Sequence, residues 1–269
     1  MNAPAISVLI RAKDEEASIG QTLGLLAAQS LPHEVIVVDS GSRDATVEIA
    51  RHAGAHVIEI AASDFTFGGS LNTGCEAATA ETVVALSAHA FPPDPTWLER
   101  MLAPFADERV ACACGQQFSS DGEQLEEPVR QDAELARRMP VWGYSNAAGA
   151  FRRSLWEQRP FREEMPATED KEWALYWLDR GYVCVLDPEL LVEHDHSKDG
   201  LLDQYRRARR EWIGIGMMLG ELPPYTLGDL FREWWLEQDS YRSPSRARLS
   251  HRRAVRLVGT YAGRRPRRM

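Results

Sequence analysis

Charged side chains follow the first apolar run of the chain, at the point where that run ends. The run Ile6–Ile10 is followed by Arg11 and then by three carboxylates, Asp14, Glu15 and Glu16. An arginine at a strand end, with carboxylates at the start of the next helix, can hold a phosphate or a ribose. The acidic residues taken alone would equally complement the positive end of a helix, so Arg11 carries the binding prediction.

A further carboxylate, Asp39, ends the apolar run Glu34–Val38. An ionised carboxylate at the end of a buried strand costs free energy unless it meets a hydrogen-bond donor, and a nucleotide base or ribose would be such a donor. Beyond it, Gly41 permits a tight turn, and Ser42 and Asp44 are suited to cap the following helix. We therefore expect Asp39 to contact a ligand.

A glycine-rich segment follows the third apolar run. Gly68 and Gly69 open the next expected helix and would leave backbone N–H groups free to face an anion. Asn72 and Gly74 would allow close packing of this helix on a sheet, or the approach of a ligand. No G-x-G-x-x-G pattern follows the first run, which disfavours a dinucleotide-binding dehydrogenase.

Short β-type runs alternate with helical spacing in the elements that must position these residues. We expect strands at Ile6–Ile10, Glu34–Val38, His56–Ile60, Thr82–Leu86 and Val110–Cys114. Helices are expected between them at Glu15–Gln29, Asp44–Ala53, Ser70–Ala80 and Pro95–Phe105. Later helices are expected at Gln131–Arg138, Glu169–Arg180, Leu201–Met218 and Leu227–Glu237, with one more strand at Val183–Leu186. This alternation predicts an α/β fold, a Rossmann-like mostly parallel sheet with helices on both faces.

The composition is that of an ordinary globular protein. Of the 269 residues, 44% are hydrophobic and 26% are charged, which excludes a disordered, collagen-like or coiled-coil chain. No run of 18 apolar residues occurs, so we expect no transmembrane helix, and the N-terminus is expected to form a strand instead of a signal peptide. The four cysteines lack a metal-binding spacing, Cys112 and Cys114 are expected as small core residues on one face of a strand, and a reduced, cytoplasmic protein is expected.

Charge is distributed unevenly along the chain. The net charge is −9, and residues 241–269 hold ten arginines without an acidic residue, so residues 1–240 carry −19. This acidic body argues against nucleic-acid binding. The C-terminal region has Trp234 and Trp235 beside Phe231. It would pack back on the domain, bury a homodimer interface or make a peripheral contact at the inner face of a membrane, and these alternatives stay open.

Five segments, in this order, resemble those of the family-2 glycosyltransferases with the GT-A fold. They are Arg11-x-Lys-Asp-Glu-Glu16, Val35-Ile-Val-Val-Asp39-Ser-Gly-Ser-x-Asp44-x-Thr46, Leu86-Ser-x-His89-Ala-x-Pro-x-Asp-x-x-Trp97-Leu98, Ala167-Thr-Glu169-Asp170-Lys-Glu-Trp173-Ala174 and Asp187-Pro-Glu-x-x-Val-x-His194-x-His196. The resemblance covers roughly Ile6 to Arg210. It implies a GT-A domain over residues 1–200 and a helical C-terminal extension with a basic tail over residues 201–269.

The resemblance implies a nucleoside-diphosphate sugar that lies across the carboxyl edge of the sheet. Asp39 matches the carboxylate that reads the base, and Arg11 and Glu16 fall where the family holds the nucleoside. Asn72 is also expected to contact the nucleotide sugar. Asn146 is expected to bond a hydroxyl of the donor sugar, because the small residues of Tyr144–Gly149 would let the donor approach the backbone.

The resemblance also implies a divalent cation, which the family binds through an Asp-x-Asp motif after the fourth strand. Here that motif is Ser87-Ala88-His89. His89 is expected to bind Mn²⁺ or Mg²⁺ together with His194, which matches the family's metal-site histidine, and imidazole suits Mn²⁺ better than Mg²⁺. The alternative is that protonated His89 neutralises the diphosphate without any metal.

The family places its catalytic base at the acidic pair that Glu169 and Asp170 match, with Asp170 in the position of the base. Such a base takes the proton of an acceptor hydroxyl as that oxygen attacks the anomeric carbon, which inverts the carbon. The acceptor would be a glycan, a glycolipid or a small metabolite. The lost Asp-x-Asp motif motivates an alternative, a non-catalytic nucleotide- or carbohydrate-binding relative. A nucleotidyltransferase is disfavoured, since an acidic segment follows the first strand instead of a glycine-rich and basic one.

Overall fold

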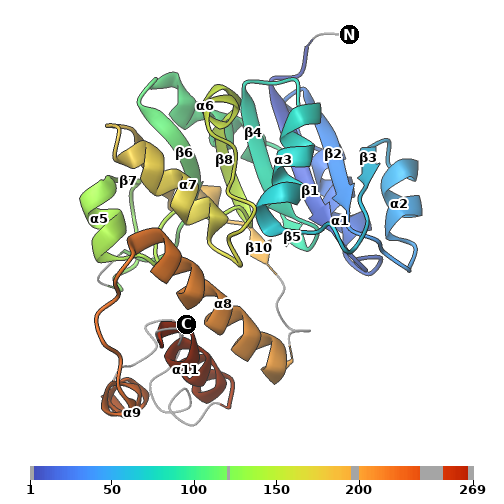
Figure 1. The fold of residues 1–269 in the computed structure, drawn as a ribbon. Helices are drawn as coiled ribbons and strands as arrows, with labels where there is room; N and C mark the ends of the chain where they lie inside the picture. Colours follow the sequence, from blue (N-terminus) through green and yellow to red (C-terminus); the bar gives the residue numbers. More distant parts are fainter. Residues whose placement is uncertain (1–2, 120–121, 195–199, 237–250, 266–269) are drawn as a thin grey trace. The chain divides into compact units, whose positions relative to one another are not determined.

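The computed structural model describes residues 3–119, 122–194, 200–236 and 251–265 (Figure 1). The chain forms two compact units. The first contains Met1–Glu164 and Glu169–Asp195, and the second contains Met165–Thr168 and His196–Met269. The second unit thus includes the short segment that directly precedes Glu169. The expected division between residues 200 and 201 stays a prediction.

An eight-stranded sheet organises the first unit. Its strands are β1 (Ile6–Ala12), β2 (His33–Asp39), β3 (His56–Glu59), β4 (Thr82–Ser87), β6 (Val110–Gly115), β7 (Val129–Gln131), β8 (Ala148–Arg152) and β9 (Val183–Asp187). They lie in the order β3-β2-β1-β4-β8-β6-β9-β7. The pairs β1–β2, β1–β4, β2–β3 and β6–β9 are parallel, whereas β8 is antiparallel to both neighbours and β7 to β9. The predicted mostly parallel sheet is therefore confirmed.

Helices cover both faces of this sheet (Figure 1). Successive residues of a strand point to opposite faces, and in β1 the side chains of Val8 and Ile10 lie in one buried cluster while Leu9 lies in another. The first cluster includes side chains of α1 (Ile19–Ala27), α2 (Thr46–His52) and α4 (Trp97–Leu102). The second includes side chains of α3 (Phe67–Ala77), α6 (Arg153–Gln158) and α7 (Glu169–Leu178). The predicted two-faced helical cover is confirmed.

One central strand differs from the prediction. Residues 148–152 form β8 between β4 and β6, a strand that was not predicted, whereas the expected approach of a donor to the backbone of Tyr144–Gly149 stays a prediction. The small side chains serve packing, because a Cβ on Gly149 would lie 2.4 Å from the carbonyl oxygen of Ser145. The helix expected from Glu15 also begins later, at Ile19, since the backbone N–H groups of residues 14–16 donate to side chains of the loop after β2 and the start of α2.

The second unit contains α8 (Leu201–Leu219), α9 (Leu227–Leu236) and α11 (His251–Arg264). Two glycines of α11 let it pack closely on α8. A Cβ on Gly259 would lie 2.6 Å from the carbonyl oxygen of Tyr205, and one on Gly263 would lie 2.5 Å from that of Arg209. Among the residues that the structure describes, no helix is long and apolar enough to cross a membrane.

Candidate active site

The ends of three neighbouring strands bring the first candidate residues together. β1 lies between β2 and β4, and the three strands are parallel, so their carboxyl ends meet at one edge of the sheet. Arg11 is level with Val38 in β2 and with Ser87 in β4, and Asp39 is level with Ala12. The sheet thus places the predicted binding residues Arg11 and Asp39 at the same edge, but one residue out of register, so their side chains point to opposite faces of the sheet.

Arg11 links this edge to the acidic pair, although 158 residues separate it from Glu169. The Arg11 Nη1 atom donates to the carbonyl oxygen of Phe67 at 2.9 Å and to Glu169 Oε1 at 3.2 Å. The Glu169 side chain is only 4% exposed. Its burial raises the pKa of the Glu169 carboxyl, the charge of Asp170 raises it further, and Arg11 opposes both. Glu169 is therefore held at Arg11, in a part of the site that is closed to water.

Asp170 is half-buried and held by two backbone donors. Its Oδ2 atom accepts a hydrogen bond from the Asn146 N–H at 3.1 Å, and its Oδ1 accepts one from the Lys171 N–H at 2.7 Å. The Lys171 Nζ atom donates to the carbonyl oxygen of Tyr144 at 3.0 Å. Lys171 therefore ties the start of α7 to the loop before β8. Sequence reasoning missed this residue, because a single lysine in a helix carries no distinguishing pattern.

Thr168 directly precedes the pair and has a φ of 65°. A β-branched residue rarely adopts this left-handed conformation, and strained backbone of this kind gathers at functional sites. The strain turns the chain immediately before Glu169 and Asp170 enter the first turn of α7. Nothing in the residue type of Thr168 indicated this, so the sequence alone could not have found it.

Asn146 carries an unsatisfied donor beside Asp170. Its Oδ1 atom accepts a hydrogen bond from the Tyr144 hydroxyl at 2.8 Å, whereas its Nδ2 atom is buried and has no hydrogen-bond partner among the described residues. A buried amide group without a partner destabilises a fold by about 1–3 kcal/mol. The side chain is therefore suited to donate to a ligand oxygen, in line with its predicted contact to a sugar hydroxyl.

Asp39 receives its donors from its own turn. Its Oδ1 atom accepts from the N–H groups of Gly41 at 3.0 Å and Ser42 at 2.9 Å, and its Oδ2 accepts from the Ser42 hydroxyl. Gly41 has a φ of 83°, which explains a glycine at this position. The structure thus shows how a buried carboxylate is tolerated at the strand end. The predicted contact between Asp39 and a base stays a prediction.

Glu16 joins two strand-end loops. Its Oε2 atom accepts from the Ala45 N–H at 3.1 Å, and its own N–H donates to Asp44 Oδ2 at 3.1 Å. Asp14, with a φ of 54°, accepts from the Arg43 N–H at 2.8 Å. These contacts hold the loop after β1 against the loop after β2, so the acidic residues do not cap α1. The predicted contact of Glu16 with a nucleoside is not tested by this arrangement.

Asn72 is engaged within the protein. Its Nδ2 atom donates to the carbonyl oxygen of Phe161 and to Glu163, and its Oδ1 accepts from the Trp156 indole and the Phe161 N–H, all at 2.9–3.2 Å. It therefore anchors the segment before α7, and its predicted donor contact stays a prediction. The Gly69 N–H, expected to be free for an anion, instead donates to the Thr66 hydroxyl at 2.8 Å. Thr66 caps α3 with this hydrogen bond, and that expectation is wrong.

The structure brings His89 and His194 together. Short strands β5 (Ala90–Phe91) and β10 (Glu193–His194) pair antiparallel, with His194 opposite Ala90. The two imidazole rings stack with centroids 4.7 Å apart and planes 13° apart. His89 Nδ1 lies 3.0 Å from Glu15 Oε1. Glu15 thus belongs to this cluster, although sequence reasoning assigned it only to the start of a helix.

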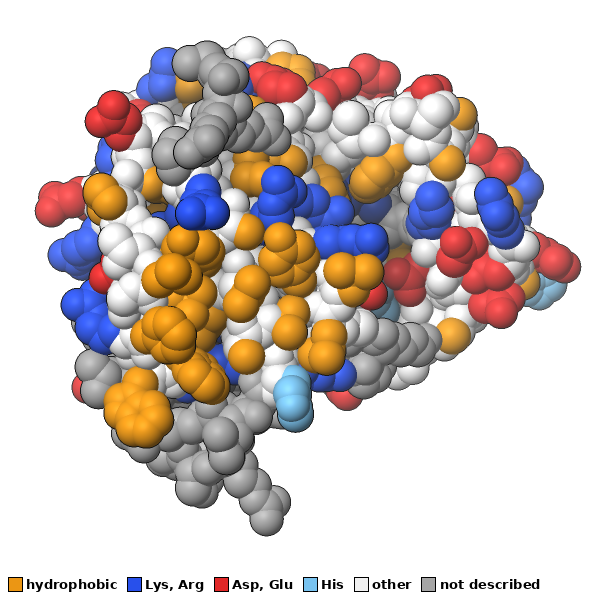
Figure 2. Space-filling model, turned by 60° about the horizontal axis from the view of Figure 1, so that its bottom comes forward, with side chains coloured by type: hydrophobic (Ala, Val, Ile, Leu, Met, Phe, Trp, Pro, Cys, Tyr) orange, Lys and Arg blue, Asp and Glu red, His pale blue; other side chains and the backbone are white. Residues whose placement is uncertain are grey.

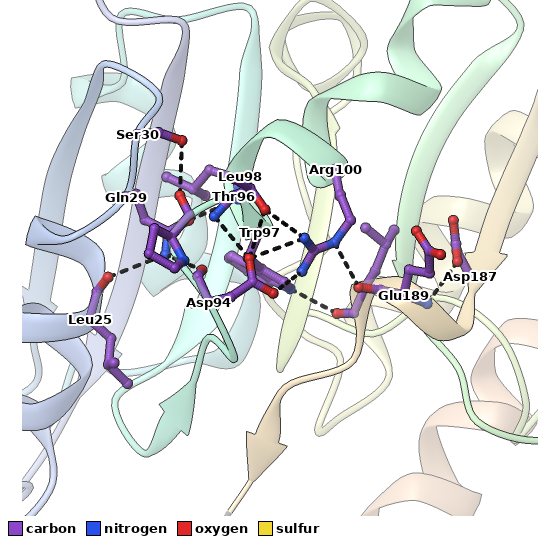
Figure 3. Close-up of polar contacts among 12 residues, drawn as sticks. Leu25, Gln29, Ser30, Asp94, Thr96, Trp97, Leu98, Arg100, Asp187 and Glu189 are labelled. Atoms are coloured by element: carbon purple, nitrogen blue, oxygen red, sulfur yellow. Dashed lines mark hydrogen bonds and ion pairs between the residues drawn. The ribbon is translucent and has the colours of Figure 1, made fainter.

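A network of hydrogen bonds from α4 holds the turn that precedes β10 (Figure 3). The 3₁₀ turn Pro188–Leu190 lies just before β10. The Trp97 indole donates to the Leu190 carbonyl oxygen at 3.0 Å, and Arg100 Nε donates to the Glu189 carbonyl oxygen at 3.2 Å. Arg100 also pairs with Asp94 at 2.6 Å, and its hydrogen bonds hold the pKa of the Asp94 carboxyl far below its usual range. Helix α4 therefore positions the strand that carries His194.

The two histidines in this arrangement do not fit a shared metal ion. Imidazole lone pairs lie in the ring planes, so in two stacked rings they run nearly parallel instead of converging on one ion. Within the described parts of the chain, no group of three or more His, Cys, Asp or Glu side chains could hold a metal ion. His196, the other histidine of the motif, lies outside the described residues. The predicted pair is confirmed as neighbours, but its expected role as a metal site is not supported by the geometry.

Comparison with solved structures shows the fold. A mannosyltransferase from Pyrobaculum calidifontis, solved with GDP-Man and Mn²⁺, has a TM-score of 0.65 at 21% identity, covering 83% of this chain and 66% of that one. Glucosyl-3-phosphoglycerate synthase from Mycobacterium tuberculosis, solved with Mn²⁺ and UDP-Glc, has a TM-score of 0.57 at 20% identity, covering 82% and 80%. The chain has the GT-A fold of these neighbours.

Comparison of sequences shows the family. An O-antigen chain rhamnosyltransferase of Salmonella typhimurium is 27% identical over 182 residues, and one of Salmonella anatum is 29% identical over 183. The matches cover 62% of this chain and 58% of each relative, so the chain spans less than two thirds of their length. The profile of glycosyl transferase family 2 matches residues 7–173, more than half of the chain. The chain therefore belongs to glycosyl transferase family 2.

Proposed function

We propose that this protein transfers a sugar from a nucleoside-diphosphate sugar to an acceptor hydroxyl, with inversion at the anomeric carbon. The observation that carries the proposal is the fixed carboxylate of Asp170, which lies beside the unsatisfied amide of Asn146. A base and a donor for sugar hydroxyls are the two groups that such a transfer needs in one place. The rhamnosyltransferase and mannosyltransferase relatives support a hexose or deoxyhexose as the transferred group.

Asp170 acts as the general base in this proposal. Its carboxylate removes the acceptor's hydroxyl proton while the acceptor oxygen forms its bond to the anomeric carbon. The bond from that carbon to the diphosphate oxygen breaks on the opposite face, and the nucleoside diphosphate leaves with the electron pair. Two backbone N–H groups orient the Asp170 carboxylate, so no large rearrangement is needed to present it.

Glu169 is a positioning residue in the same mechanism. Its carboxylate is buried on Arg11, which makes it a poor candidate for reaching an acceptor. The pair instead fixes the start of α7 relative to the strand end of β1. Arg11 retains exposed surface, with 24% of its side chain accessible, and its guanidinium is suited to hold the nucleoside or a phosphate of the donor.

His89 is proposed to hold the diphosphate as a cation. A protonated imidazole whose Nδ1–H donates to Glu15 presents its Nε2–H to a phosphate oxygen. This follows from the histidine cluster, which is not arranged to share a metal ion.

The runner-up function is a non-catalytic nucleotide-sugar-binding relative of the same fold. The replacement of Asp-x-Asp by Ser87-Ala88-His89 favours it. The fixed carboxylate of Asp170 at the start of α7 weighs against it, because sugar binding alone does not require a base. The acceptor is proposed to be a glycan, a glycolipid or a small metabolite. Formation of a glycosylated product distinguishes the transferase from the non-catalytic binding protein.

Calorimetry with a panel of sugar nucleotides, each with Mn²⁺, with Mg²⁺ and with chelator, identifies the donor. Release of the nucleoside diphosphate then measures turnover in Asp170→Asn. We expect this variant to bind the donor as the wild type does and to lose about 10²–10⁴-fold in turnover. Asp179→Asn is the matched control, because Asp179 directly follows α7 and forms an exposed ion pair with Arg137. Wild-type turnover in Asp170→Asn would remove Asp170 from the mechanism, and donor binding without any turnover in the wild type would favour the runner-up.

A further inference from the structure

Helix α9 exposes a row of large apolar side chains. Leu227, Phe231 and Trp235 are 57%, 58% and 75% exposed. Residues spaced by four lie on one side of a helix, so these three form a continuous strip, called here the apolar row. Leaving such side chains in water is unfavourable in proportion to their apolar area, and contiguous exposed patches of this kind mark interaction surfaces.

The other side of α9 is already anchored in the second unit. The buried side chain of Arg253 in α11 donates to the carbonyl oxygen of Glu233 at 2.7 Å. Tyr225, which precedes α9, contacts the ring of Tyr261 in α11 at a centroid distance of 6.3 Å and hydrogen-bonds to Glu233. These contacts hold the side of α9 that carries Glu233 against α11, whereas the apolar row stays exposed.

The unit that carries the apolar row is basic. Residues 165–168 and 196–269 contain sixteen Lys and Arg against eight Asp and Glu, a net charge of +8, so the rest of the chain carries −17. Exposed arginines lie on α8 at Arg206 and Arg209 and on α11 at Arg252 and Arg256. At physiological salt, charges act over about 8 Å, so a nearby surface is attracted or repelled by this unit's own charge.

We propose that the apolar row docks on an anionic phospholipid bilayer. Figure 2 shows hydrophobic side chains gathered on one face, with Lys and Arg side chains at its margin. A helix that lies in a membrane interface has such a composition, with Trp, Phe and Leu on one side and basic residues near the lipid headgroups. A second copy of the chain fits less well, since a symmetric dimer through this face would bring two +8 units together.

The proposal is independent of the transfer reaction, and it is tested on the full chain without donor or acceptor. Co-sedimentation with vesicles of phosphatidylglycerol and phosphatidylcholine in equal parts measures the partition coefficient. We expect binding that is lost on pure phosphatidylcholine and weakened by raising the salt from 0.1 to about 0.5 M. The double variant Phe231→Ser/Trp235→Ser is expected to reduce the partition coefficient at least about tenfold.

Val141→Ser is the matched control, because Val141 is a 47%-exposed apolar residue of the first unit. It should bind vesicles as the wild type does. Circular dichroism on all variants confirms that they are folded, which we expect because the replaced side chains are exposed. Absence of binding to anionic vesicles, or undiminished binding of the double variant, overturns the proposal. A wild-type dimer that the double variant converts to a monomer, with no vesicle binding by either, assigns the row to a second copy instead.

Discussion

The pair formed by Arg11 and Glu169 offers the sharpest test of how the site is assembled. Replacing Arg11 with Met keeps an unbranched stem but removes the charged guanidinium, whose carbon lies 5.5 Å from the centroid of the Phe67 ring. The Glu169 carboxylate, 4% exposed, then stays buried beside Asp170 without its cation. The structure predicts a loss of stability that depends on pH.

The magnitude follows from burial. Removing one partner of a fully buried ion pair costs about 3–5 kcal/mol. Because 24% of the Arg11 side chain is exposed to screening water, we expect the free energy of unfolding to fall by about 2–3 kcal/mol near pH 8. Glu169→Gln should cost less, about 1–2 kcal/mol, since Arg11 keeps its bond to the Phe67 carbonyl oxygen.

The sign of the pH dependence is opposite to that of an ordinary salt-bridged acid. Burial raises the pKa of the Glu169 carboxyl above its usual 4.5, and loss of Arg11 raises it further. At pH values between the pKa of Glu169 in the unfolded state and its higher pKa in the folded state, the folded state then binds more protons than the unfolded state. The free energy of unfolding of Arg11→Met therefore falls as pH rises through that window. The variant should lie closest to wild type near pH 5.

Urea denaturation at pH 5, 6.5 and 8 measures these differences for the wild type, both single variants and the double variant. The double variant should lose about 1–2 kcal/mol less than the sum of the two single losses, because it leaves no uncompensated buried charge. A loss in Arg11→Met that is the same at every pH, or additive losses in the double variant, would show that the two side chains are not coupled.

Three further outcomes are expected. Gly115→Ala should lower the free energy of unfolding by about 1–3 kcal/mol, because the new Cβ would lie 2.7 Å from the backbone of Leu190. Gly24→Ala, in helix α1 with nothing within 4 Å of its Cβ, should instead raise the free energy of unfolding by about 0.5–1 kcal/mol. Equal effects of the two variants in urea denaturation would contradict the close packing at Gly115. Asn146→Ala should raise KM for the donor about tenfold with turnover largely kept, and an unchanged KM would detach its amide from the donor. His89→Ala should weaken donor binding equally with Mn²⁺ and with chelator in calorimetry, whereas a loss seen only with Mn²⁺ would restore the metal role.

The sheet and its helical cover were predictable because they depend on local patterns. The strands β1, β2 and β4 are short apolar runs buried on both faces, and such runs are recognisable without knowledge of their neighbours. The strand β8 was not predictable in this way. Its residues Ala148–Arg152 are mostly small, and the crowding of Gly149 by Ser145 and Tyr144 of the preceding loop, which leaves no room for a side chain, is seen only in the structure.

The candidate site was predictable by position but not by partner. Arg11, Asp39 and the acidic pair follow strands or begin a helix, so their presence at the sheet edge could be expected from the topology. The contact of Arg11 with Glu169 joins residues 158 apart, and no local pattern encodes such a pairing. The role of Glu15 at His89 was missed for the same reason, because a carboxylate near a helix start has a sufficient local explanation.

The left-handed backbone of Thr168 has a consequence for conformational entropy at the proposed base. Glycine adopts this conformation with little strain, yet the chain has a β-branched residue there, at a φ of 65°. A β-branched residue has fewer accessible backbone states than glycine, so the peptide that leads into Asp170 has less freedom to lose. On folding, this segment therefore loses less backbone entropy than a glycine at position 168 would, and the strain of the left-handed threonine offsets part of that gain.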